Sequence, residues 1–139
     1  MIPTATHGLG TLAVLPGVPE SAGRARAVVR RVLGPDHPAA QAAVACVSEL
    51  AANAINHTPS GLPGGTFTLS VHDGGDAVRI AVTDVGSNTR PRARRPRLTS
   101  THGRGLAIVA AVAAAWGNKR TGSGQITWCE IHASDTKIA

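Results

Sequence analysis

Three polar side chains recur at four-residue steps near the middle of the sequence, at Glu49, Asn53 and His57. Because four residues are slightly more than one helical turn, these side chains would form one stripe on a helix, opposite a stripe of alanine, valine and isoleucine. An ordinary amphipathic helix has this pattern as well. The alternative interpretation is a functional site and makes a more specific prediction. A carboxylate can orient or deprotonate a hydroxyl group, and an amide oxygen one turn away can hold Mg²⁺.

A carboxylate also stands where an apolar segment ends, at Asp84 in the stretch AVTDVGS, two residues before Gly86. In this position it could accept a hydrogen bond from the exocyclic amine of a base. The alternative is a simple turn after a strand, in which aspartate and glycine are common.

Two glycines, Gly103 and Gly105, flank Arg104 and precede an apolar stretch that starts at Leu106, in the sequence HGRGLAIV. A helix that begins here would present free N–H groups and the positive end of its dipole to a phosphate. Glycines lack side chains, so the backbone could approach the phosphate closely. A flexible loop that simply joins a helix would have a similar sequence.

Arginine supplies nearly all of the formal net charge of +6, which favours anionic partners. Five arginines lie between positions 90 and 97, within a stretch from 86 to 102 that has no useful periodicity. We expect a mobile loop there, because so long a loop in a compact domain is usually functional, often a lid, or else disordered. The arginines could be solvated, contact phosphates or bind an acidic protein. Nucleic acid is the weakest alternative, since no helix-turn-helix signature and no aromatic residues for stacking accompany them.

The rest of the composition indicates a cytoplasmic protein. Cys46 and Cys129 lie far apart in the sequence, so two buried free thiols are favoured over a disulfide. The six histidines show no zinc-binding spacing. No apolar run is long enough to span a membrane, and the N-terminus lacks the charged and apolar regions of a signal peptide.

Hydrophobic periodicity predicts a single domain over residues 1–139, in which three helices pack against one sheet as a two-layer α/β sandwich. The expected elements, in chain order, are a strand at 11–15, helices at 19–33 and 38–57, strands at 67–71 and 78–82, a helix at 105–116 and a strand at 125–132. The third helix would carry Val109, Val112 and Trp116 on its inner side and end at Gly117. Residues 72–76 would connect the two middle strands as a hairpin.

The three motifs occur in the order ELxxNAxxH, DxG and GxGL. This order closely resembles the GHKL (Bergerat-fold) ATPase superfamily, which includes the ATPase domains of gyrase-type enzymes and histidine kinases. The nearest likeness is to the anti-sigma-factor serine/threonine kinases, particularly their single-domain actinobacterial relatives, and it spans almost the whole chain. It implies a mixed, mainly antiparallel sheet covered on one face by three helices.

The resemblance also implies a role for each motif, with ATP and Mg²⁺ as cofactors. On the helix, Asn53 would hold Mg²⁺ between the phosphates, Glu49 would be the general base or orient the acceptor hydroxyl, and His57 would lie beside the phosphates. Asp84 would bind the adenine amine, and Gly86 would let the base lie close.

The glycine-containing loop would wrap the phosphates, through Gly103, Arg104, Gly105 and Leu106, and the arginine-rich stretch at 86–102 would be the ATP lid. The implied partners are a sigma factor, an anti-anti-sigma protein of the STAS-like kind, or both, and a second copy of the chain in a homodimer. In such a protein the γ-phosphate of ATP would pass to a serine or threonine of the antagonist, and the regulated process would be transcription.

Among the departures from the family pattern, two concern the nucleotide site. Asn88 stands where many relatives have a second glycine, and Ile126 stands where a threonine often contributes to a water network at adenine. Regular strand alternation, counted from Ile126, places the neighbouring Thr127 on the other face. These departures motivate an alternative function, a non-catalytic nucleotide-binding or partner-docking module with the same fold.

Overall fold

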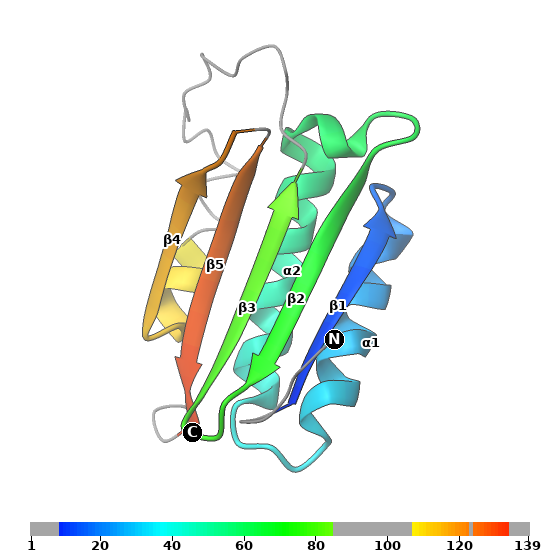
Figure 1. Ribbon diagram of the computed structural model, residues 1–139. Helices are drawn as coiled ribbons and strands as arrows, with labels where there is room; N and C mark the ends of the chain where they lie inside the picture. Colours follow the sequence, from blue (N-terminus) through cyan, green and yellow to red (C-terminus); the bar gives the residue numbers. More distant parts are fainter. Residues whose placement is uncertain (1–8, 85–106, 123, 134–139) are drawn as a thin grey trace.

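Five strands form one sheet in the order β1-β2-β3-β5-β4 (Figure 1). The structure is a computed structural model that describes residues 9–84, 107–122 and 124–133. The strands are β1 (Leu9–Pro16), β2 (Thr66–Asp73), β3 (Ala77–Asp84), β4 (Ala115–Arg120) and β5 (Gln125–His132). All four pairings between these strands are antiparallel, whereas the prediction allowed for a mixed sheet.

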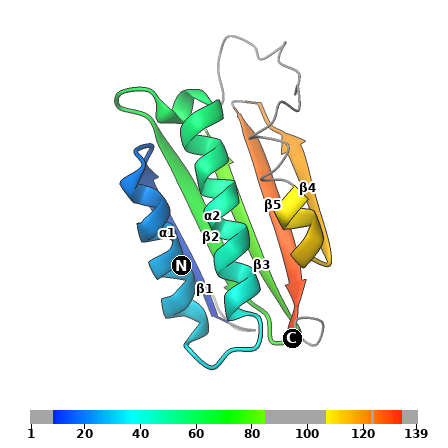
Figure 2. The same ribbon diagram turned by 180° about the vertical axis from the view of Figure 1, so that it is seen from behind.

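Helices cover one face of this sheet, as Figure 2 shows. They are α1 (Glu20–Leu33), α2 (Ala40–His57) and a shorter helical segment at residues 107–112; a single 3₁₀ turn, η1 (Pro59–Gly61), follows α2. α1 ends at Gly34, whose φ of 86° suits glycine and whose N–H donates to the carbonyl of Arg30 at 2.8 Å. The predicted α/β sandwich, with three helices on one face, is therefore confirmed.

The core lies between the helices and the sheet. Alternate residues of β2 and β3, such as Leu69 and Val82, point toward the helices and are buried, as expected from their period of two. From the helices, Val29 of α1 and Leu50 of α2 are buried against them. The opposite face of the sheet has no helix on it in the described part of the chain, and Leu12 of β1 is 71% exposed.

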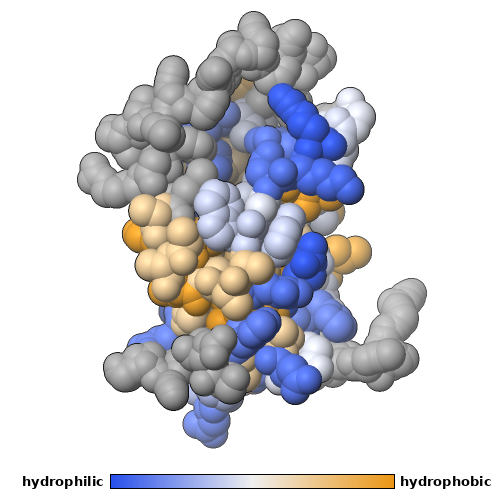
Figure 3. All heavy atoms as spheres, turned by 90° about the vertical axis from the view of Figure 1, so that its left-hand side faces the viewer, coloured by the Kyte–Doolittle hydropathy of each residue, from blue (hydrophilic) through white to orange (hydrophobic). Residues whose placement is uncertain are grey.

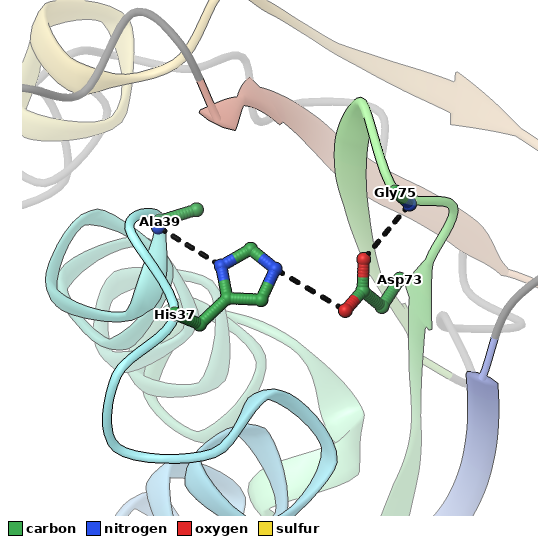
Figure 4. Close-up of polar contacts among 4 residues, drawn as sticks. All are labelled: His37, Ala39, Asp73 and Gly75. Atoms are coloured by element: carbon green, nitrogen blue, oxygen red, sulfur yellow. Dashed lines mark hydrogen bonds and ion pairs between the residues drawn. The ribbon is translucent and has the colours of Figure 1, made fainter.

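The N-terminus of α2 is held against the β2–β3 hairpin by a histidine (Figure 4). The N–H of Ala39 donates to Nδ1 of His37 at 3.0 Å, and Nε2 of His37 lies 3.2 Å from Oδ2 of Asp73. Since Nδ1 accepts a hydrogen bond, a neutral His37 ring carries its proton on Nε2 and donates it to Asp73. Asp73 in turn accepts from the N–H of Gly75 at 2.9 Å. These bonds set the position of α2 along the sheet, and the bond between Gly75 and Asp73 lies within the predicted hairpin.

The third predicted helix is wrong in its second half. Helical residues stop at 112, and Ala115–Arg120 form strand β4, which contains Trp116 and Gly117. The N–H of Ala114 already donates to the carbonyl of Glu130 in β5, at 2.8 Å. At Gly117 the ring of Trp128 is so close that an added Cβ would lie 2.9 Å from its Cζ2 atom. Pairing with β5 therefore overrides the helical tendency of this alanine-rich stretch.

The side chains that were expected on the inner side of this helix separate as a result. Val109 is fully buried, whereas Val112 and Trp116 are 36% and 37% exposed. Figure 3 shows the side of the molecule formed by β4 and the 107–112 segment, where apolar side chains gather on the surface. β4 is an edge strand, so these residues are only half enclosed.

Candidate functional site

A buried carboxylate marks the end of β3. Asp84 is the last residue of this strand and is only 4% exposed. Burial raises the pKa of Asp84 to about 6, while a hydrogen bond from Gln125 and the positive charge of Arg120 oppose this rise. Because the pKa remains below 7, the carboxylate is mostly ionised at neutral pH. It is also shielded from water, so a hydrogen bond that it accepts is stronger than one at the surface.

The polar stripe of α2 runs toward the same end of the sheet. Glu49 and Asn53 are half-buried, and His57, the last residue of the helix, is exposed. In Figure 1 the C-terminal half of α2 lies beside the end of β3, at the upper end of the sheet. The structure therefore brings Glu49 and Asn53 toward the end of the sheet that carries Asp84. His57 ends the same stripe.

A pair of cysteines shows which side of α2 faces β5. Cys46 and Cys129 are both free and buried, as predicted, and their thiols are hydrogen-bonded to each other. This hydrogen bond and burial raise the pKa of the Cys129 thiol. Asn53 lies two turns after Cys46 on the same side of the helix, so it lies on the side of α2 that faces β5.

Polar side chains form the part of the sheet next to Asp84. Nε2 of Gln125 donates to Oδ2 of Asp84 at 3.1 Å. Nδ2 of Asn118 donates to Oε1 of Gln125 at 3.2 Å and to Oγ1 of Thr127 at 2.8 Å. Three strands, β3, β5 and β4, thus contribute to one hydrogen-bonded row, although Asn118 and Gln125 were not among the predicted site residues.

Thr127 and Ile126 lie on opposite faces, as alternation predicts, but it is Thr127 and not Ile126 that shares the face of Asp84. Gln125 pairs with Asp84 and Thr127 pairs with Val82, so both β5 side chains share the helix-covered face with Asp84. Thr127 is 5% exposed, and Ile126 lies on the opposite face, paired with Thr83. The sequence is ambiguous here because Ile126 and Trp128 are as apolar as the residues of the other parity. Only the register with β3 decides the faces. Next to Gln125 on the face of Asp84, β5 therefore carries Thr127 rather than Ile126.

The remaining predicted site residues lie outside the described part of the chain. They are Gly86, Gly103, Arg104, Gly105 and Leu106, together with Asn88 and the expected ATP lid at 86–102. The helical segment at residues 107–112 follows the glycine-containing loop directly in sequence.

The chemistry of the described residues fits an adenine nucleotide with a hard cation. A buried, mostly ionised carboxylate matches the exocyclic amine of adenine, which donates hydrogen bonds. An amide oxygen such as that of Asn53 suits Mg²⁺, which keeps several waters and takes few protein ligands when it is bound to phosphates. Among the described helices, none is long and apolar enough to cross a membrane.

These features define a class of protein, and a comparison with protein families identifies it. The family model for the histidine kinase-like ATPase domain matches residues 15–130 of the chain. The chain therefore belongs to the histidine kinase-like ATPase domain family, which supports an ATP-binding regulatory function.

A solved structure shows the same fold. It is the histidine kinase domain from the blue-light activated histidine kinase of Erythrobacter litoralis EL346. The two chains superpose with a TM-score of 0.57 and share 20% sequence identity, over 97% of this chain and 68% of the other. A comparison with curated proteins gave no match.

Proposed function

We propose that the chain is an ATP-dependent serine/threonine protein kinase of the anti-sigma-factor kind, which binds ATP with Mg²⁺ at the end of the sheet that carries Asp84. The observation that carries this proposal is the buried Asp84 carboxylate, held by Gln125 at the end of the sheet toward which the Glu49–Asn53 stripe runs. The order of motifs along the chain supports the assignment to this branch of the family.

Asp84 is the residue that selects the base. Its carboxylate accepts a hydrogen bond from the 6-amino group of adenine, whereas the 6-oxo group of guanine would face it with a second acceptor. Burial strengthens both the attraction and the repulsion, because little water screens them. Adenine nucleotides are therefore favoured over guanine nucleotides.

The polar stripe of α2 acts on the phosphates. Asn53 holds Mg²⁺, which when bound neutralises charge on the phosphate oxygens. Glu49 orients the hydroxyl of the protein acceptor and takes its proton as the oxygen attacks the γ-phosphorus. A new O–P bond forms to the acceptor, the bond between the γ-phosphorus and the bridging oxygen breaks, and ADP leaves. His57 would lie beside the phosphates, and the role proposed for Gly103, Arg104, Gly105 and Leu106, which lie outside the described residues, is to contact the phosphates.

The proposed acceptor is a STAS-like antagonist protein, and the proposed target of sequestration is a sigma factor. The net charge of +6 supports an acidic partner, because opposite charge speeds the encounter of two proteins. The protein would then link ATP to transcription, by releasing or holding the sigma factor.

The test compares the wild-type chain with Glu49→Gln. Calorimetry with ATP and Mg²⁺ measures binding, and labelled ATP with a purified STAS-like antagonist measures transfer. Glu49→Gln should bind ATP within about twofold of wild type but transfer phosphate about 100-fold more slowly or not at all. Glu130→Gln, on the face of the sheet away from the helices, is the matched control and should retain both activities. If wild type does not bind millimolar ATP, nucleotide binding is refuted; if it binds ATP without Glu49-dependent transfer, the kinase assignment is refuted.

The second candidate is the non-catalytic module. It was motivated by Asn88 and Ile126, and the position of Thr127 beside Asn118 weakens the second of these reasons, since a β5 threonine does lie on the face of Asp84. ATP binding without transfer in the same experiment would support it.

A further inference from the structure

A directional hydrogen-bond chain runs across three strands to Asp84. Asn118 of β4 donates to Thr127 and to Gln125 of β5, and Gln125 donates to Asp84 of β3. Asp84 and Gln125 are direct cross-strand partners, as are Asn118 and Thr127. All four side chains therefore stand on the helix-covered face, at the end of the sheet where the nucleotide is proposed to bind.

The polarity of this chain follows from the chemistry of its members. An ionised carboxylate only accepts hydrogen bonds, so Gln125 must turn its NH₂ group toward Asp84 and its carbonyl oxygen away. That oxygen then needs a donor, which Asn118 supplies through Nδ2. The carbonyl oxygen of Gln125 only accepts, so it fixes the orientation of Asn118, whose NH₂ group also donates to the hydroxyl of Thr127. Each amide thus has one orientation that satisfies its neighbours.

We propose that Asn118 and Gln125 are positioning residues that determine base specificity, because they hold Asp84 as an ionised acceptor and so make the site take a 6-amino purine and reject a 6-oxo purine. This inference rests on the proposed function, since it concerns the same nucleotide site. A carboxylate has two oxygens and can accept from Gln125 and from a base amine together.

The two protonation states of Asp84 suit different bases. Ionised, the carboxylate accepts from the amine of adenine; protonated, it can donate to the 6-oxo oxygen of hypoxanthine or guanine. Burial raises the pKa of Asp84 to about 6, and without the bond from Gln125 the pKa would move closer to neutral pH. Loss of the chain therefore changes which base is preferred as well as how tightly ATP binds.

The surroundings of Asp84 allow this effect to be isolated. Among the described residues, the charged or titratable groups at this end of the sheet are Arg120 of β4 and Glu49 and His57 of α2, together with Lys119, which lies on the other face of β4. Of these, Arg120 lowers the pKa of Asp84. Neither substitution tested below alters Arg120, Glu49 or His57.

The experiment uses two variants with different chemistry. Gln125→Met removes the donor and keeps the length of the side chain. Asn118→Leu keeps the approximate size of the side chain but removes the donor without adding a charge, so the Gln125 amide is no longer held with its NH₂ group toward Asp84. Lys119→Gln is the matched control, because residue 119 is the immediate neighbour of Asn118 but lies on the other face of β4.

The measured quantities are the Kd values for Mg²⁺ complexes of ATP and inosine triphosphate from pH 5.5 to 8.5, with the titration of Asp84 followed by carbon NMR. Wild type and Lys119→Gln should prefer ATP, with affinity rising as pH rises through about 6. In Gln125→Met and Asn118→Leu the midpoint should move to higher pH, and the preference for ATP at pH 7 should fall, about tenfold in Gln125→Met, because a hydrogen bond to a charged group is lost or weakened. At pH 8.5 most of the preference should return.

A merely structural role gives a different result. Both nucleotides would then weaken equally at every pH, and the titration of Asp84 would not move. That outcome in both variants, with wild type still binding ATP, overturns this inference and leaves the proposed function in place. Failure of wild type to bind ATP overturns the proposed function, and the inference with it. If Gln125→Met does not fold, as judged by circular dichroism, Asn118→Leu decides.

Discussion

Two aspartates end neighbouring strands of the same hairpin, yet the molecule uses them differently. Asp73 ends β2 and has a side chain that is 17% exposed; Asp84 ends β3, at the opposite end of the sheet, and is 4% exposed. Asp73 is satisfied by a local turn through Gly75 and by His37 (Figure 4). Asp84 is satisfied by an amide from a strand 41 residues away, and its pKa is raised.

The difference supports the proposal that Asp73 has a structural role and Asp84 binds a ligand. At the Asp73 end every bond joins parts of the scaffold: a hairpin, a helix start and a histidine between them. At the Asp84 end burial raises the energy of the charged form, and the hydrogen-bond chain compensates only in part. A buried charged acceptor that destabilises the fold is found most often at a functional site, where binding of a ligand stabilises the charge.

The largest expected effect comes from removal of the charge of Asp84, at the proposed nucleotide-binding end of the sheet. Asp84→Asn replaces the acceptor carboxylate by an amide, so ATP affinity should fall about 100-fold at pH 7, because hydrogen bonds to a charged group are lost. Calorimetry with Mg·ATP measures this loss. The same substitution at the other end, Asp73→Asn, should leave ATP affinity within about twofold. Equal losses in the two variants would remove the distinction between the two ends.

The second prediction concerns the stability of the fold, which the Asp84 carboxylate lowers at pH 7, whereas it raises the affinity for ATP. Asp84 has a pKa of about 6 when folded against 3.8 as a free group, so the folded state holds the proton more tightly. Stability should therefore fall as pH rises from 3.8 through about 6, by roughly 3 kcal/mol in total.

Urea unfolding of wild type and Asp84→Asn across this pH range measures the effect. The variant should lack this part of the pH dependence and should be more stable than wild type at pH 7, although it binds ATP poorly. A variant that is less stable than wild type at pH 7 would mean that the carboxylate stabilises the fold.

The third and smallest effect belongs to the structural end. His37→Ala removes the acceptor for the Ala39 N–H and the partner of Asp73. α2 has no side-chain cap of its own at Ala39, so the free energy of unfolding should fall by about 1–2 kcal/mol.

The ratio of ATP to inosine triphosphate affinity should not change in His37→Ala, because the substitution lies at the other end of the sheet. His37→Asn keeps a side-chain acceptor near the helix start and should recover part of the stability. A changed ratio would show that the two ends are coupled through α2.

Much of the fold was predictable because it depends on local patterns. The period of 3.6 residues identified α1 and α2, Gly34 ended the first of them, and the period of two with an Asp-Gly-Gly turn identified the β2–β3 hairpin. β4 was missed because the run of alanines before Trp116 has no strand pattern, and pairing with β5 alone makes it a strand.

The site was predictable in part, for a related reason. Glu49, Asn53 and Asp84 could be selected because short motifs carry their chemistry, although their roles remain predictions. Asn118 and Gln125 could not be selected, because neither belongs to a motif and each gains its importance from a partner on another strand.

The sequence by itself determined the helices, the central hairpin, the buried thiols and the family, since each of these follows from composition, periodicity or residues close together in the chain. The tertiary structure alone decided which face of β5 carries Thr127, which strand supports Asp84 and how strongly burial shifts its pKa. Strand register and burial arise from contacts between residues that are distant in sequence, and a shift of one residue in register would turn every side chain of β5 to the other face.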